Sequence, residues 1–291
     1  MIPMQIKLQN PYKRILKTLA CVGLWLSVCL LIECDFLQHV SSLSEVMKSE
    51  IGRSVDTIPD YPCTLGAHRG ASTEHLENSY PALIAATKDP RYAFIEFDVQ
   101  YTKDEQIVVF HDKRLLRLFG RLATINNSTY AELVEATDGQ IALYKDVMDA
   151  LDKKLNIEIK SQGDYEEDCR LAEAIIEDIQ ARGREKDIMI SSISSDVIRY
   201  IKQKDHSIPT GQIYWLTPST YLHFEGLTRR LYEKFSESKA DYLMLHVANF
   251  RNMEDLLKFK PRDKTIMFWD FDDQMYLVHL CDRRYLEKHR L

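Results

Sequence analysis

Residues 95–112 read IEFDVQYTKDEQIVVFHD, and this stretch decides how the rest of the chain is interpreted. Two apolar-rich runs flank a polar turn at 102–105, which is typical of a β-hairpin. Residues two apart in a strand point to the same face, so Glu96 and Asp98 lie side by side and repel each other. A divalent cation would neutralise that repulsion, and His111 would stand beside the pair if the hairpin folds back. Taken alone, the stretch fits a metal-assisted acid–base site and a half-exposed strand with a polar face about equally well.

The composition is that of an ordinary globular protein and narrows the range of partners. The chain has 291 residues, 45% of them hydrophobic and 28% charged, which allows one large domain or two small ones. Its net charge is -6, and the globular part contains no stripe rich in lysine and arginine, which argues against a nucleic-acid partner. The six cysteines include no CxxC pair, which argues against a zinc site. The oligomeric state stays open.

The N-terminal part of the chain is predicted to lie outside the globular domain. Residues 1–14 form a basic segment, residues 15–37 contain an uncharged apolar run, and residues 38–60 have the polar, mixed composition of a linker. The apolar run suits a transmembrane anchor or a signal peptide, and we favour the anchor because a cleavage site is weak. The basic residues before the run predict a cytoplasmic N-terminus and a periplasmic or extracellular domain. Signal cleavage would instead give a secreted protein.

From residue 61 to residue 291 the chain predicts an α/β domain, because apolar runs alternate with helical patterns. The expected strands cover residues 64–67, 94–99, 155–159, 188–191, 211–215, 242–246 and 265–269, and the expected helices cover residues 79–88, 129–136, 144–151, 165–182, 195–203, 221–236 and 253–259. This alternation over about 230 residues is the pattern of a TIM-type (β/α) barrel or of a doubly wound sheet, with the β-hairpin inserted after the second strand.

Unusual polar residues follow several of these expected strands. In a barrel the chemistry is carried by the carboxyl ends of the strands. The first strand is followed by His68, Arg69 and Gly70. The histidine is a base, the arginine suits phosphate, and the glycine permits close approach to the backbone. Glu158 and Lys160 repeat, near the end of another strand, the pattern of charges two residues apart.

With these motifs in place, the chain resembles the glycerophosphodiester phosphodiesterase family. The matching segments are His68-Arg69-Gly70, Glu77-Asn78-Ser79, Ile95–Val99, Thr102 with Asp104, Val109–Asp112 and Asn156–Lys160. The resemblance implies a TIM barrel and a set of residue roles. Glu96, Asp98 and Glu158 would bind a divalent cation, Mg²⁺ or Ca²⁺, and carboxylate ligands suit such hard cations. His68 and His111 would be the general acid and base, Arg69 and Lys160 the phosphate clamps, and Glu77 and Asn78 supporting groups.

The reaction that the resemblance implies is metal-dependent hydrolysis of glycerophosphodiesters to glycerol 3-phosphate and an alcohol. A second interpretation uses the same residues for a phospholipase-D-like hydrolysis of lysophospholipids or sphingolipids. A third is a non-catalytic barrel with a binding role. The third is motivated by the C-terminus, where Met275–Leu280 does not read as the final strand that the family usually has. We therefore expect the last barrel strand to be atypical or missing.

Overall fold

The computed structural model describes residues 63–215, 217–222, 224–246, 249, 252–269 and 274–278. Within these residues, no helix has the length and apolar character needed to cross a membrane. The predicted basic segment, the predicted anchor at 15–37 and the predicted linker at 38–60 all lie outside the described residues.

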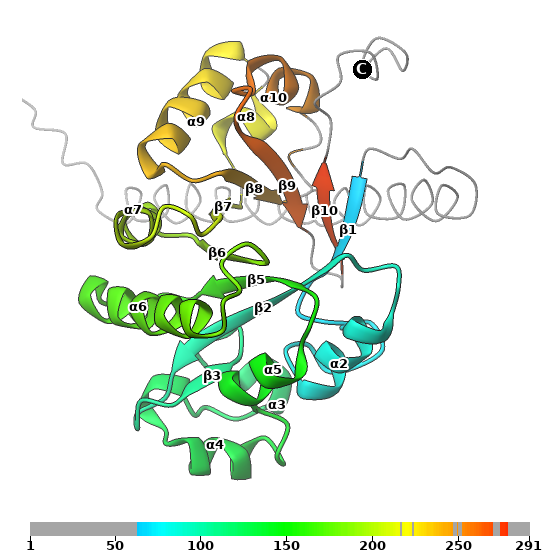
Figure 1. Ribbon diagram of the computed structural model, residues 1–291, viewed down its shortest axis with the longest axis vertical. Helices are drawn as coiled ribbons and strands as arrows, with labels where there is room; N and C mark the ends of the chain where they lie inside the picture. The colour runs from blue at the N-terminus through cyan, green and yellow to red at the C-terminus, as the bar shows by residue number, and fades with distance from the viewer. Residues whose placement is uncertain are drawn as a thin grey trace, which may run out of the picture. The chain divides into compact units, whose positions relative to one another are not determined.

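Strands and helices alternate along the described chain (Figure 1). The strands are β1 Cys63–Ala67, β2 Phe94–Tyr101, β3 Ile107–Val109, β4 Ala142–Leu143, β5 Lys154–Ile159, β6 Ile188–Ser192, β7 Thr210–Tyr214, β8 Tyr242–His246, β9 Thr265–Trp269 and β10 Gln274–Val278. The helices are α2 Tyr80–Lys88, α3 Leu116–Phe119, η1 Ile125–Asn127, α4 Tyr130–Ala136, α5 Tyr144–Ala150, α6 Tyr165–Ala181, α7 Ser195–Lys204, α8 Pro218–Tyr221, α9 Glu225–Ser238 and α10 Met253–Phe259. The helix expected over 221–236 is thus two helices, and the shorter one begins at Pro218, a residue that is common at helix N-termini.

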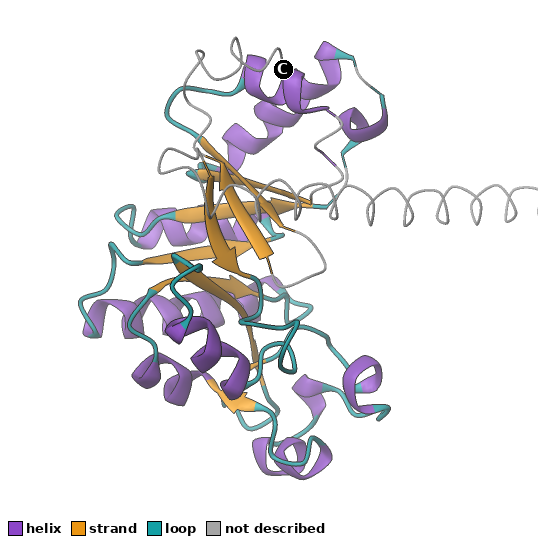
Figure 2. Cartoon of the chain, turned by 90° about the vertical axis from the view of Figure 1, so that its right-hand side faces the viewer, coloured by secondary structure: helices purple, strands orange, loops and turns teal. Residues whose placement is uncertain are grey.

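All strands except β3 and β4 pair in a closed ring, in the order β1, β2, β5, β6, β7, β8, β9, β10 and back to β1. Neighbours from β1 to β9 are parallel, which confirms the predicted α/β fold and its TIM-type strand arrangement. The helices lie outside the strands (Figure 2). Helix α6 illustrates the pattern, because Leu171, Ile175 and Ile179 recur on one face and are fully buried.

The last strand of the ring is atypical but not missing, which is one of the two alternatives that the sequence predicted. No strand was evident in Met275–Leu280, yet β10 lies there and pairs antiparallel with both β9 and β1. A parallel crossover needs about a dozen residues or more, whereas only residues 270–273 separate β9 from β10. The chain therefore returns directly as an antiparallel strand. The sequence interpretation looked for a helix followed by a parallel strand and missed this one.

The predicted hairpin after the second barrel strand is confirmed. Strand β3 pairs antiparallel with β2, with Val99 opposite Val109, and β4 extends the pairing beyond β3. The segment between β3 and β4 packs around its own small apolar core, which is formed by Val108, Phe110, Leu115, Ile125, Leu133 and Ile141. This core holds the residues that follow β3 beside the barrel.

Gly70 lets the loop after β1 pack directly on α2. Its φ is +80°, and a Cβ atom at this position would lie 2.7 Å from the carbonyl carbon of Ala82. The next residue donates a 3.0 Å hydrogen bond from its backbone N–H to the Ala82 carbonyl oxygen. A side chain at residue 70 would push this loop away from the helix.

We expect Gly70→Ala to lower the free energy of unfolding by about 3 kcal/mol, since backbone strain and overpacking add. Gly139→Ala is a matched control, because Gly139 has φ +74° and open space around it, and strain alone should cost about 1 kcal/mol. Urea denaturation of both variants measures the difference. Equal losses in the two variants would show that the close approach to Ala82 is unimportant.

Candidate active site

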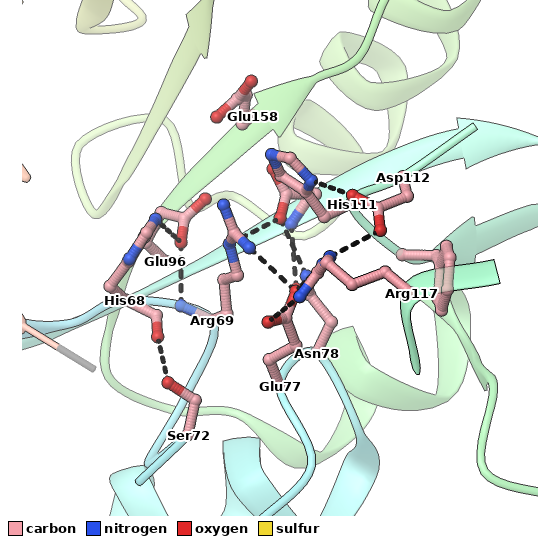
Figure 3. A network of polar contacts seen from close by, with 12 residues as sticks. His68, Arg69, Ser72, Glu77, Asn78, Glu96, His111, Asp112, Arg117 and Glu158 are labelled. Atoms are coloured by element: carbon pink, nitrogen blue, oxygen red, sulfur yellow. Dashed lines mark hydrogen bonds and ion pairs between the residues drawn. The ribbon is translucent and has the colours of Figure 1, made fainter. Parts of the chain in front are cut away.

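The predicted site residues come together at the carboxyl ends of β1, β2 and β5 (Figure 3). His68 and Arg69 directly follow β1, and Glu77 and Asn78 end the same loop before α2. The other members come from or follow β2, β3 and β5: Glu96, Asp98, His111, Glu158 and Lys160. A cavity of about 60 Å³ lies among six of them, His68, Arg69, Glu96, His111, Glu158 and Lys160.

Three carboxylates, those of Glu96, Asp98 and Glu158, lie close together in the candidate site. Strands β2 and β5 pair in a register that sets Asp98 opposite Glu158, and Glu96 shares the face of Asp98. One oxygen from each carboxylate lies within 4.8 Å of the others. The Glu96 and Asp98 side chains are almost fully buried, and that of Glu158 is 12% exposed. Glu96 Oε1 and Asp98 Oδ1 accept no hydrogen bond from any described residue.

The three carboxylates differ in how strongly neighbouring groups shift their pKa values. Burial, together with the nearby charges of Asp98 and Glu158, raises the pKa of Glu96 well above its ordinary value. Burial also raises the pKa of Glu158, although Lys160 opposes this change by donating a 2.6 Å hydrogen bond to Glu158 Oε1. The charge of Arg69 and its backbone N–H oppose this rise in the pKa of Glu96 but do not outweigh it. Two of these hard oxygen donors, Glu96 Oε1 and Asp98 Oδ1, accept no hydrogen bond from any described residue, and three clustered carboxylates fit a divalent cation.

Asp98 stays ionised because cations and an amide surround it. Burial alone would raise its pKa, but the charges of Lys160, His111 and Arg69 hold that pKa far below its usual range. Lys160 Nζ lies 3.4 Å from Asp98 Oδ1, and Arg69 Nε lies 3.5 Å from Oδ2. Asn78 Nδ2 donates a 2.7 Å hydrogen bond to Asp98 Oδ2, and the Asp98 N–H donates to Asn78 Oδ1. Asn78 therefore fixes the orientation of this carboxylate.

The two histidines border the same cavity from different elements. His68 is 5% exposed, its Nε2 lies 3.9 Å from Glu96 Oε2, and its ring centroid lies 6.0 Å from that of Trp269. His111 follows the hairpin, and its Nδ1 lies 2.6 Å from Asp112 Oδ1. A carboxylate on Nδ1 orients the ring and leaves Nε2 for a proton transfer.

Arg117 joins the two loops that carry the histidines, and reasoning from the sequence missed it. Its guanidinium donates to both oxygens of Glu77, at 2.8 and 2.6 Å, and its Nε donates to Asp112 Oδ2 at 2.7 Å. Glu77 also accepts a 2.8 Å hydrogen bond from Arg69 Nη1. A continuous chain of ion pairs thus runs from Arg69 to His111 (Figure 3). No pattern in the sequence predicts the contact between Glu77 and Arg117, because the two residues are 40 positions apart.

Residues 68–284 match the sequence model of the glycerophosphoryl diester phosphodiesterase family. The chain belongs to this family. The match includes every one of the predicted site residues, and it confirms the family resemblance inferred from the motifs.

Individual members of the glycerophosphoryl diester phosphodiesterase family resemble parts of this chain. Lysophospholipase D GDPD3 of Mus musculus is 41% identical over 75 residues, which are 26% of this chain and 22% of that protein. Lysophospholipase D GDPD1 of Rattus norvegicus is 29% identical over 160 residues, which are 49% of each chain. The chain thus spans about half or less of the length of these two relatives.

A solved member of the family extends the similarity to the fold. The crystal structure of a glycerophosphodiester phosphodiesterase from Thermotoga maritima is 28% identical, with a TM-score of 0.55. The matched region covers 77% of this chain and 88% of the Thermotoga maritima chain. The similarity therefore extends over most of the barrel domain.

Proposed function

We propose that this chain is a metal-dependent phosphoric diester hydrolase that converts glycerophosphodiesters to glycerol 3-phosphate and an alcohol. One observation carries the proposal. Two carboxylates, two histidines and two cationic side chains border one small cavity, and one carboxylate oxygen there, Glu96 Oε1, accepts no hydrogen bond from any described residue. A non-catalytic barrel would gain nothing from keeping Glu96 and Asp98 buried side by side.

Glu96, Asp98 and Glu158 would hold the cation, Mg²⁺ or Ca²⁺. Their oxygens are of the kind that both ions prefer, and Glu96 Oε1 and Asp98 Oδ1 accept no hydrogen bond from the described residues. A bound divalent cation would withdraw charge from the non-bridging phosphate oxygens.

The chain's own residues supply proton transfer and phosphate binding. One of His68 and His111 would take the proton from the attacking hydroxyl or water, and the other would protonate the leaving alcohol. Arg69 and Lys160 border the same cavity and would bind the phosphate oxygens. Glu77 holds Arg69, and Asn78 holds Asp98, so both act by positioning other groups.

We further propose that residues 15–37 anchor the protein in a membrane, with the barrel on the periplasmic or extracellular side. The support is the uncharged run in the sequence and the basic residues before it. The mass of the mature protein from membranes tests the anchor. A protein that retains Met1–Leu37 supports it, and a shortened, secreted protein contradicts it.

A paired assay tests the proposed reaction. We expect the purified chain to release glycerol 3-phosphate from glycerophosphocholine in the presence of Mg²⁺ or Ca²⁺, and to stop when EDTA is added. Choline release from lysophosphatidylcholine tests the second candidate, lysophospholipid hydrolysis, which the names of the mouse and rat relatives favour. A folded, cation-loaded protein that cleaves neither compound would contradict the proposal.

Replacing Arg117 by methionine should lower kcat for glycerophosphocholine about 10- to 100-fold and change KM little. The physical reason is that Asp112 and Glu77 would lose their common partner, so the His111 and Arg69 side chains would no longer be held in place. Arg117→Lys should recover part of the activity, because it keeps the charge.

Arg121→Met is the matched control, because Arg121 is exposed in the same segment. Steady-state kinetics of the three variants gives the comparison. Equal kcat values for Arg117→Met and Arg121→Met would rule out a positioning role for Arg117.

A further inference from the structure

A second, much larger cavity adjoins the small one that holds the carboxylates and histidines. Its volume is about 600 Å³, against about 60 Å³ for the small cavity. The two share Arg69, His111 and Lys160 on their walls. A phosphate bound by these cationic side chains would therefore have one of its substituents in the large cavity.

The walls of the large cavity are mainly apolar. Ile193, Ile213, Trp215 and Trp269 line it, together with the ring of Tyr214. Two of these side chains are unusually exposed for their size, Ile193 at 67% and Trp215 at 53%. Apolar side chains that stay exposed beside a catalytic cavity are typical of a surface that receives an apolar ligand.

Two of the residues that line the cavity, Gln212 and Tyr214, have a buried polar atom without a hydrogen-bond partner among the described residues. Gln212 is 1% exposed, and its Nε2 donates a 2.7 Å hydrogen bond to the carbonyl oxygen of Ile193, which fixes the amide. Its Oε1 accepts no hydrogen bond from any described residue. A buried acceptor without a donor costs free energy, so it indicates a hydroxyl or water in the cavity. A substrate glycerol hydroxyl would satisfy it.

The charges of the large cavity exclude one class of occupant. Its lining includes Arg69, Lys160 and Lys234, and no carboxylate among the described residues. Aromatic walls suit a quaternary ammonium group in general, but Lys234 and the lack of a carboxylate among the described lining residues disfavour one here, and Arg69 and Lys160 are paired with carboxylates outside this cavity. The cavity therefore fits the glycerol side of the phosphodiester and does not fit a choline or ethanolamine head group.

We propose that the large cavity binds the acyl or alkyl chain of a lysophospholipid substrate. This inference rests on the proposed phosphodiesterase function. A glycerol group is only a few times larger than a water molecule, which takes about 30 Å³, so it would leave most of the cavity empty. A chain attached to the glycerol would fill the space between Ile213 and Trp269 and reach Ile193 and Trp215 at the exposed end.

Kinetics with monomeric substrates tests the chain-binding role. For the wild type, kcat/KM should rise along a series from glycerophosphocholine to lysophosphatidylcholines of increasing chain length, by up to about fourfold for each methylene. The variant Trp215→Ala, at a residue that lines the large cavity and not the small one, should lower kcat/KM for the long-chain substrate about tenfold and leave glycerophosphocholine turnover unchanged. Leu122→Gln is the matched control, because Leu122 is 73% exposed and does not line the cavity.

Equal losses for both substrates in Trp215→Ala would overturn the inference. So would a rate advantage for lysophosphatidylcholine that appears only above its micelle concentration, since that result points to docking on a lipid surface.

Binding of dodecylphosphocholine keeps the inference testable if neither substrate is cleaved, an outcome that would refute the proposed function alone. The full-length chain should bind monomeric dodecylphosphocholine at least tenfold more tightly than butylphosphocholine, as measured by calorimetry. The Trp215→Ala variant should lose most of this preference. An equal affinity for the two ligands in the wild type would overturn chain binding.

Discussion

Replacing either His68 or His111 by alanine should lower kcat for glycerophosphocholine by about a thousandfold, because each variant lacks one of the two proton transfers. Both histidines border the cavity that also contains Glu96 and Glu158, and no other described histidine borders it. The expected loss is similar for the two variants, since attack and departure of the alcohol each need a proton transfer.

Two further measurements separate lost chemistry from lost structure. His206→Ala is the control, because His206 is exposed and outside the cavity, and it should keep wild-type kcat. Mg²⁺ or Ca²⁺ should still raise the melting temperature of the His68 and His111 variants, since neither residue is a proposed ligand. Near-wild-type turnover in either variant would refute the assignment of the pair.

Replacing Glu96 by glutamine should have two opposite effects. Turnover should fall by about a hundredfold or more, because the cation would lose a ligand. The cation-free protein should become more stable, because burial and the charges of Asp98 and Glu158 make the ionised form of Glu96 costly. A glutamine oxygen can still accept the 2.8 Å hydrogen bond from the Arg69 N–H.

The sign of the pH dependence follows from the raised pKa of Glu96. A folded-state pKa above the ordinary 4.5 stabilises the protein at low pH, and this contribution is lost as pH rises through the raised pKa. The gain from Glu96→Gln should therefore be larger at pH 8 than at pH 5, by about 3–6 °C in Tm.

Thermal melts with and without Mg²⁺ give the measurement, with Glu135→Gln at an exposed helix position as control. In the wild type and the control, Mg²⁺ should raise Tm, and in Glu96→Gln it should not. A Glu96→Gln variant that melts lower than the wild type without cation would contradict the account of the buried carboxylates.

Most of the barrel could be predicted because its elements carry local signals. Two apolar runs and a polar turn predicted the hairpin, and the apolar periodicity of Tyr165–Ala181 predicted a helix there. The antiparallel strand β10 could not be predicted in the same way. Its place as the closing strand of the ring depends on pairing with β1, which lies at the other end of the domain, and a short segment carries no local sign of such a partner.

In the candidate site, too, some residues could be predicted from local sequence signals and others could not. Glu96 and Asp98 could be singled out because strand geometry puts them on one face, and His68 and Glu158 because they lie at or after the ends of expected strands. Arg117 could not be found, because its role exists only once α3 lies against the loop before α2. The large cavity could not be foreseen either, since its walls combine residues from several strand ends and from α9.

Restoration of activity by a titrated cation tests the central claim most directly. The full-length chain is stripped with EDTA, and release of glycerol 3-phosphate from glycerophosphocholine is followed as Mg²⁺ or Ca²⁺ is added back. We predict no release in the stripped protein, full recovery with saturation at one cation per chain, and no recovery in Asp98→Asn at any concentration. A stripped protein that keeps its rate, or an Asp98→Asn variant that recovers as the wild type does, would contradict a cation site built on these carboxylates.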